Sequence, residues 1–215
     1  MKKKNLLTAA ASLALVAVIG VGATLAYFTD KTDVKTNVFT TGSVDVELID
    51  EAFKVDEDEV WTFEKNDVGG YHYSDVMPGD QIGKNVAVAV QEGSQDCYVA
   101  IRVFITNTSD PEGLVTDMQP LYDQIVAASE QRGWLCADGG AGSLVFYYPH
   151  AISANSAENT AYLFSYLNIP GEWGNEYVGA ELNIDVAAAA VQAANLPAPE
   201  LGNTTVDELN KLFVG

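Results

Sequence analysis

Alternation of apolar and polar residues is the main pattern in the middle of the chain, and it predicts β-strands. Val44, Val46 and Leu48 alternate with Asp45 and Glu47, which is the period of a strand with one buried face. Similar runs rich in Val, Ile and aromatic residues follow at residues 84–91, 97–106, 144–148, 162–169 and 177–191. Residues with this preference suit the interior of a β-sandwich.

The run at residues 97–106 alternates most clearly. One face carries the aliphatic side chains of Val99, Ile101, Val103 and Ile105. Arg102 falls on the other face, where we expect it to pair with an acidic residue of a neighbouring strand. Residues 187–190 are four alanines with high helix propensity, but the preceding alternation favours a strand there, because periodicity outweighs propensity.

Two segments have helical rather than strand character. In residues 111–132, Leu121, Ile125 and Ala128 recur at helical spacing, and Gly133 is placed to end the helix. A second, short helix is expected near the C-terminus, where Thr205 and Glu208 have the spacing of a capping box.

Turn residues separate the strands. Residues 77–80 read Met-Pro-Gly-Asp and predict a tight turn, and the glycine-rich residues 139–142 predict a flexible one. Residues 51–75 are acidic and aromatic and indicate an insertion or a hairpin. Its aromatic side chains either pack on a strand face or contact a carbohydrate or protein; they are Trp61, Phe63, Tyr71 and Tyr73.

Many strands joined by turns, with one helical excursion, predict an all-β fold. We expect an antiparallel β-sandwich of the jelly-roll type with one helical insertion and a short C-terminal helix. A parallel α/β fold is disfavoured because strands and helices do not alternate regularly along the chain.

The N-terminus has the features of an export signal. Three lysines at residues 2–4 precede an uncharged stretch at residues 6–25, and Thr24 and Ala26 supply small residues for cleavage before Tyr27. An uncleaved anchor is the alternative, because about twenty residues can cross a bilayer as a helix. The glycines within the stretch weaken such a helix, so cleavage is the prediction.

The charge of the chain limits its partners. Removal of the three signal lysines takes the formal net charge from −19 to −22. Nucleic acid is disfavoured because its binding depends on Lys and Arg at the phosphates. A membrane is expected as a partner only during export, and the mature protein should be secreted to the matrix or cell surface.

Cysteine and histidine residues give little sign of catalysis or metal binding. Cys97 and Cys136 are expected to form one disulfide or to remain as two buried thiols, and they form no CxxC pair. His72 and His150 are the candidate zinc ligands, although neither lies in an HExxH pattern and zinc hydrolysis needs about three protein ligands. The acidic residues 56–59 are a candidate calcium site or a solvated charge run. We therefore expect no cofactor, with zinc or calcium as the open alternatives.

Several short segments, in this order and spacing, resemble a known family. They are residues 23–30, 37–46, 78–80, 98–103, 164, 169–171 and 183–195. Together they are similar to the TasA/camelysin family of exported Gram-positive proteins, and the resemblance covers most of residues 23–195.

The resemblance implies a secreted structural subunit of extracellular biofilm fibres. It also implies a signal processed by a dedicated signal peptidase of the SipW type, and self-association or association with a related subunit. The freed N-terminus would add as a strand to the neighbouring subunit, with Tyr27, Phe28, Val34 and Val38 in the donated segment.

The expected organisation has four parts. Residues 1–26 form the signal, 27–40 an extended donor segment, 41–195 the jelly-roll domain, and 196–215 a linker with the short helix. Loops at residues 91–94 and 153–160 depart from the family pattern, which leaves the choice of partner open.

Two other functions compete with fibre assembly. Some members of the family carry a metallo-endopeptidase label, so a camelysin-type zinc enzyme is one alternative. The other is a monomeric surface adhesin that binds through residues 51–75.

Cleavage before Tyr27 is directly testable. Replacing Ala26 by Phe should block processing, because a large side chain does not fit the small-residue position of the cleavage site. N-terminal sequencing of the exported protein should find Tyr27 first in the unchanged chain and no such product in the variant. Recovery of only full-length, membrane-held protein from the unchanged chain would contradict the prediction.

Overall fold

The computed structural model describes residues 38–41, 43–67, 69–108, 118–140, 142–174 and 178–194. The predicted signal, residues 27–37 of the donor segment, and the C-terminal linker and helix lie outside the described residues. Within the described part the fold is an all-β sandwich of two sheets with a single helix, which confirms the predicted fold class. The finer jelly-roll assignment stays a prediction.

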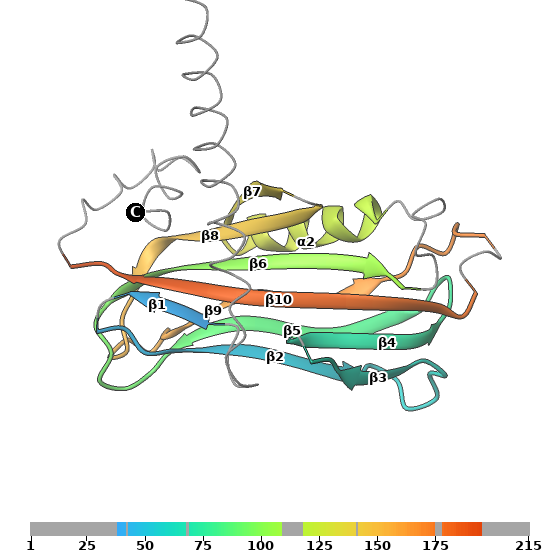
Figure 1. Cartoon of the computed structure of the whole chain (residues 1–215), viewed down its shortest axis with the longest axis horizontal. Coiled ribbons are helices and arrows are strands. Elements are labelled where there is room, and N and C mark those ends of the chain that lie inside the picture. Colours follow the sequence, from blue (N-terminus) through green and yellow to red (C-terminus); the bar gives the residue numbers. More distant parts are fainter. Residues whose placement is uncertain are drawn as a thin grey trace, which may run out of the picture. The chain divides into compact units, whose positions relative to one another are not determined.

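The larger sheet has seven strands, and Figure 1 shows three of them, β8, β6 and β10, side by side. Its main path runs in the order β3 (Thr62–Lys65), β4 (Gly70–Val76), β10 (Ala180–Gln192), β6 (Cys97–Asn107), β8 (Ser143–Ile152) and β7 (Leu135–Gly140). The seventh strand, β1 (Val38–Thr41), pairs with β10. The β1–β10 pair is parallel, and all the other strand pairs described are antiparallel.

The smaller sheet has three strands in the order β2 (Val46–Lys54), β5 (Gln81–Val90) and β9 (Thr160–Asn168). Side chains from both sheets meet in one hydrophobic core. The predicted inward face of β6 is confirmed, since Val99, Ile101 and Val103 are fully buried and Ile105 is nearly so. The regular alternation in the sequence therefore predicted correctly which face of β6 is buried.

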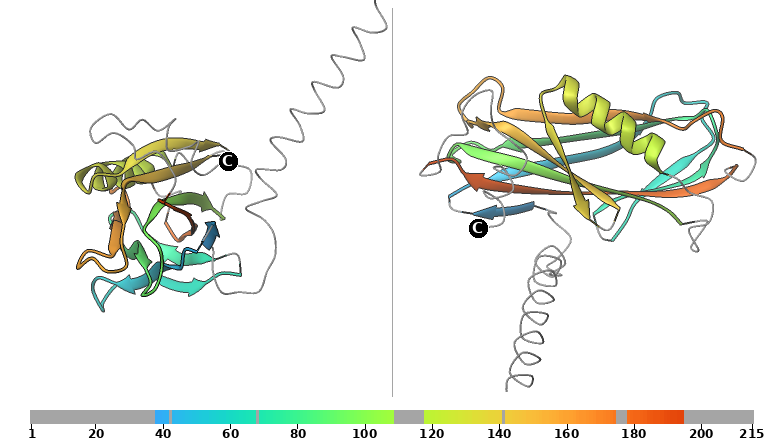
Figure 2. Two further views of the ribbon diagram at one scale, coloured as in Figure 1. Left: turned by 90° about the vertical axis from the view of Figure 1, so that its left-hand side faces the viewer. Right: turned by 90° about the horizontal axis from the view of Figure 1, so that it is seen from above.

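The helix α2 (Gln119–Gln131) covers one side of the sandwich. Leu121 and Ile125 are fully buried, and the helix packs against β9 and β7. Figure 2 shows it lying diagonally over the strands in the view from above. Gly133 follows the helix with φ 80°, the left-handed conformation expected where a helix stops. Of the helical region predicted at residues 111–132, the part at residues 119–131 is confirmed. Residues 111–117 lie outside the described residues.

The acidic and aromatic segment at residues 51–75 forms the end of β2 and the β3–β4 hairpin. Trp61 and Tyr73 are fully buried within a cluster of aromatic rings, with centroids 5.8 Å apart. This matches the packing interpretation of the aromatic residues. Residues 187–190 are part of β10, so the strand prediction for the four alanines is also confirmed.

Phe146 offers a test of the core, because its ring on β8 is fully buried between the sheets. Phe146→Ala should lower the free energy of unfolding by about 3–5 kcal/mol through lost burial and a residual cavity. Val60, with 72% of its surface exposed, is the matched control, and Val60→Ala should change stability by less than about 0.5 kcal/mol. Urea unfolding of the three proteins measures both values. Equal effects of the two substitutions would contradict this core.

Candidate functional site

One edge of β10 receives two strands from distant parts of the chain. Residues Ala180–Asp185 of β10 pair with β4, and residues Ala188–Val191 pair with β1. The two partners run in opposite directions, so they form separate ladders along the same edge. On its other edge β10 pairs with β6 without interruption from Leu182 to Gln192.

The strand β1 is the first strand of the described chain. Figure 1 shows it beside the C-terminal half of β10. Val38 is half-buried and packs against the core, and Thr40 is exposed. Its partners on β10 are Ala188, Ala189, Ala190 and Val191.

This arrangement corrects one boundary of the predicted organisation. β1 begins at Val38, inside the segment expected to be extended and donated, so the sandwich starts before residue 41. Val38 lies in a strand of its own sheet. Tyr27, Phe28 and Val34 lie outside the described residues, as do the cleavage residues Thr24 and Ala26.

A different edge of the sandwich, that of β9, is covered by α2 and the residues after it. The Gln124 side chain donates to the Asn168 carbonyl at 2.8 Å and accepts from the Asn168 amide at 2.8 Å. The Trp134 indole donates to the Tyr162 carbonyl at 2.9 Å. Side chains therefore occupy backbone groups at which another chain would otherwise add to β9.

A buried ion pair connects β2 and β5, and the sequence reasoning missed it. The ammonium of Lys84 contacts the Asp50 carboxylate, and the Lys84 side chain is completely buried. The Tyr71 ring lies over the ammonium, 4.8 Å from it to the ring centroid. The sequence did contain an indication of a buried charge, because Lys84 interrupts an alternating apolar run between Ile82 and Val86.

The electrostatics of this pair are dominated by burial. Loss of solvent raises the pKa of Asp50 and lowers the pKa of Lys84, and in both cases it outweighs the attraction of the partner charge. Burial also raises the pKa of Asp185 on β10, whose carboxylate accepts a hydrogen bond from the Asn66 amide at 2.6 Å. Both carboxyl groups are thereby shifted toward their neutral forms.

The two histidines do not come together. His72 is on β4 and shares a hydrogen bond of 2.9 Å with Asn183. His150 is on β8, and β10 and β6 lie between these two strands. Three inter-strand steps amount to roughly 14 Å. Joint ligation of one zinc ion by both histidines is therefore wrong, and no group of three metal-ligating side chains occurs among the described residues.

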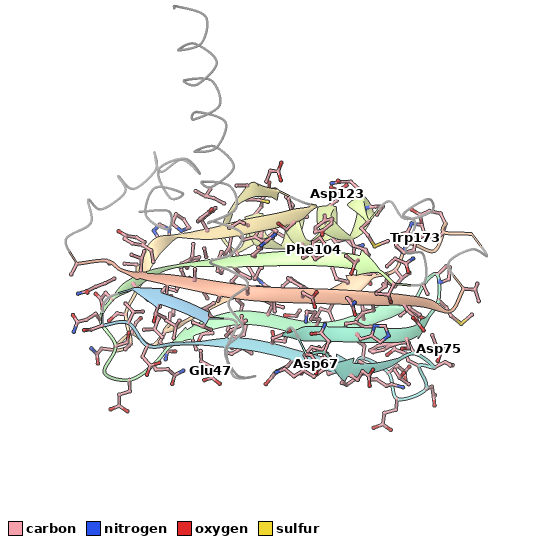
Figure 3. The ribbon with its side chains drawn as sticks, viewed as in Figure 1. Glu47, Asp67, Asp75, Phe104, Asp123 and Trp173 are labelled. Atoms are coloured by element: carbon pink, nitrogen blue, oxygen red, sulfur yellow. The ribbon has the colours of Figure 1, made fainter. Side chains whose placement is uncertain are left out.

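The acidic side chains of the surface are either far from one another or hydrogen-bonded within their own turn. Figure 3 shows Glu47, Asp67, Asp75 and Asp123 at separate places on the surface. In the turn at residues 56–59, the Glu59 carboxylate accepts hydrogen bonds from the backbone amides of residues 55 and 56. This turn therefore satisfies its own polar groups, as a solvated charge run does.

Arg102 also differs from its prediction. Its Nε donates to the Ser143 hydroxyl at 2.9 Å rather than to a carboxylate, because Ser143 of β8 lies close across the ladder. The salt bridge found among the described residues joins Lys84 to Asp50 and does not involve Arg102.

Cys97 and Cys136 are both free in the structure, so the predicted disulfide between them is not formed. Cys97 is on β6 and Cys136 on β7, with β8 between these strands. Burial raises the pKa of the Cys97 thiol to about 12 and that of Cys136 to about 11. Cys97 is buried and Cys136 is half-buried, and both thiols stay protonated at neutral pH, which disfavours a role as nucleophiles.

No helix among the described residues is long and apolar enough to cross a membrane. Comparison of the chain with family models, with curated proteins and with solved structures finds no match. The assignment of a function therefore depends on the residues and on the geometry of β10.

The raised thiol pKa values predict slow alkylation of the folded protein. At pH 9 both thiols should remain protonated in the folded chain, whereas an unfolded thiol with a pKa of about 8.5 is largely ionised. Folding stability should therefore fall as the pH rises above the unfolded thiol pKa, since only the unfolded chain releases these protons. Iodoacetamide labelling followed by mass spectrometry should modify both cysteines quickly in denaturant and slowly without it. Fast labelling of Cys97 in the folded protein would contradict its burial.

Proposed function

We propose that the protein is an exported structural subunit of a TasA-like extracellular fibre, assembled by donation of its N-terminal strand. The observation that carries the proposal is the position of β1 as a four-residue parallel strand at the edge of β10. The segment that would be freed by cleavage before Tyr27 leads directly into this strand. Copies of the same chain or of a related subunit are the proposed partners.

The pairing of β1 with β10 is short enough to exchange between copies. Parallel ladders are slightly less stable per residue than antiparallel ones, and this ladder contains four residue pairs. When β1 of one copy leaves, residues Ala188–Val191 of β10 offer an open edge to the corresponding segment of another copy. A strand from outside satisfies the same backbone groups by β-augmentation.

Donation in one direction does not close on itself. Each copy gives its N-terminal segment to the next copy and receives one from the previous copy, which is a heterologous contact that generates a filament. The acidic charge of the mature chain opposes close approach of copies, and salt screens this repulsion. Export through a SipW-type signal peptidase would supply the free segment only outside the cell.

Electron microscopy tests the proposal with two proteins and a synthetic peptide. The chain starting at Tyr27 should form fibres, whereas a chain lacking residues 27–41 should remain monomeric because its donor is absent. A synthetic peptide of residues 27–41, added in excess, should bind the shortened chain and should stop fibre growth by the longer one. A peptide of the same composition in scrambled order is the matched control.

The outcomes separate assembly from the other functions. Fibres of equal yield from both chains would show that the segment is not the donor. Monomers from both chains, under conditions from low to high salt, would contradict the proposed function. In the second case, zinc content and casein cleavage with and without a chelator would test the endopeptidase alternative.

A further inference from the structure

Lys84 and Asp50 occupy core positions on neighbouring strands, where apolar side chains are expected. Asp50 follows Val46 and Leu48 on the inward side of β2, and Lys84 lies between Ile82 and Val86 on β5. In the antiparallel register Asp50 is opposite Val86, and Lys84 is opposite Ala52. The two charged side chains are therefore diagonal neighbours on the same face of the sheet.

The two functional groups touch, and water has little access to them. Lys84 Nζ is in direct contact with Asp50 Oδ1, and the two side chains are 0% and 8% exposed. The Tyr71 ring covers the amine, and the Tyr71 hydroxyl donates to the Asp50 carbonyl at 3.3 Å. Tyr73, also completely buried, places its hydroxyl 3.5 Å from the Gly83 carbonyl on the strand that carries Lys84.

Burial prepares both groups for a condensation. It raises the pKa of Asp50 and lowers the pKa of Lys84, which favours a neutral carboxylic acid beside a neutral amine. A neutral amine has the lone pair that nucleophilic attack requires. A carboxylic acid, unlike a carboxylate, carries the proton with which its hydroxyl can leave as water.

We propose that Lys84 and Asp50 become joined by an isopeptide bond between Nζ of the lysine and Cγ of the aspartate. The Nζ lone pair attacks Cγ to form a bond, and one amine proton passes to the Asp50 hydroxyl. The Cγ–O bond then breaks and one water molecule departs, so that an amide remains. Atoms and charge balance without an oxidant, a reductant or a further reactant.

Covalent closure removes the cost of two buried charges. A buried ion pair must recover the hydration lost by both ions, and replacement of such pairs by neutral groups is often stabilising. The amide leaves one N–H and one C=O in place of an ammonium and a carboxylate. It also ties β2 to β5 around residues 51–83, which include the β3–β4 hairpin. This inference goes beyond fibre assembly and holds equally for a monomeric protein.

Mass spectrometry of the reduced, denatured mature chain tests the proposal directly. The measured mass should be lower than the mass of the sequence by one water molecule. A protease digest should contain one branched peptide pair that joins the fragment with Asp50 to the fragment with Lys84. The Lys84→Arg variant should recover the full mass and lose the branched pair, because a guanidinium does not form this amide.

Lys65 supplies the matched control. Its ammonium also lies over the Tyr71 ring, at 5.9 Å, but it makes no salt bridge in the described chain and it is exposed. Lys65→Arg should therefore keep the mass deficit and the branched pair. Both variants should also be compared by thermal unfolding, where Lys84→Arg should melt well below Lys65→Arg.

A full sequence mass for the folded wild-type chain would overturn the proposal and would leave Lys84 and Asp50 as a buried ion pair. A water deficit that persists in Lys84→Arg would overturn it as well, because the loss would then come from another residue. The wild-type measurement decides the matter even if Lys84→Arg fails to fold. Circular dichroism before denaturation confirms that the wild-type sample was folded.

Discussion

The pairing of β10 along both of its edges is the constraint on which the larger sheet depends. The strand comes from the end of the described chain, and it pairs with β6 over its whole length from Leu182 to Gln192. Its second edge holds β4 and β1, which come from the beginning of the chain. The sheet is thus completed only after nearly the whole domain is available. Contacts of such large sequence separation are typical of slowly folding β-proteins.

The smaller sheet depends on a different interaction, the contact of Lys84 with Asp50. Two strands place a charge where an apolar side chain would pack, and Tyr71 of the larger sheet encloses the pair. A single buried charge would be costly at either position, so each residue requires the other. The pair also fixes the register of β2 against β5, since a slip of one residue would place the two side chains on opposite faces of the sheet.

The edges of the sandwich differ in what covers them. Side chains of α2 and Trp134 occupy backbone groups of β9, whereas the edge of β10 near its C-terminal end is held by the four residues of β1. The proposed strand addition uses the end of β10 where the chain itself supplies a short, parallel partner. Assembly of the proposed kind would need such a difference between one covered edge and one edge with a short, replaceable partner.

The sequence by itself determined the elements of the sandwich. Strand periodicity, the alanines at 187–190, the helix and the inward face of β6 could all be read locally, because a side chain's face depends on its neighbours along the strand. Only the tertiary structure decided which strands pair, that β1 meets β10, and that His72 is separated from His150. Lys84 and Asp50 show the reason most clearly. Each was visible as a polar residue in an apolar pattern, but their contact depends on a register between strands that no local pattern contains.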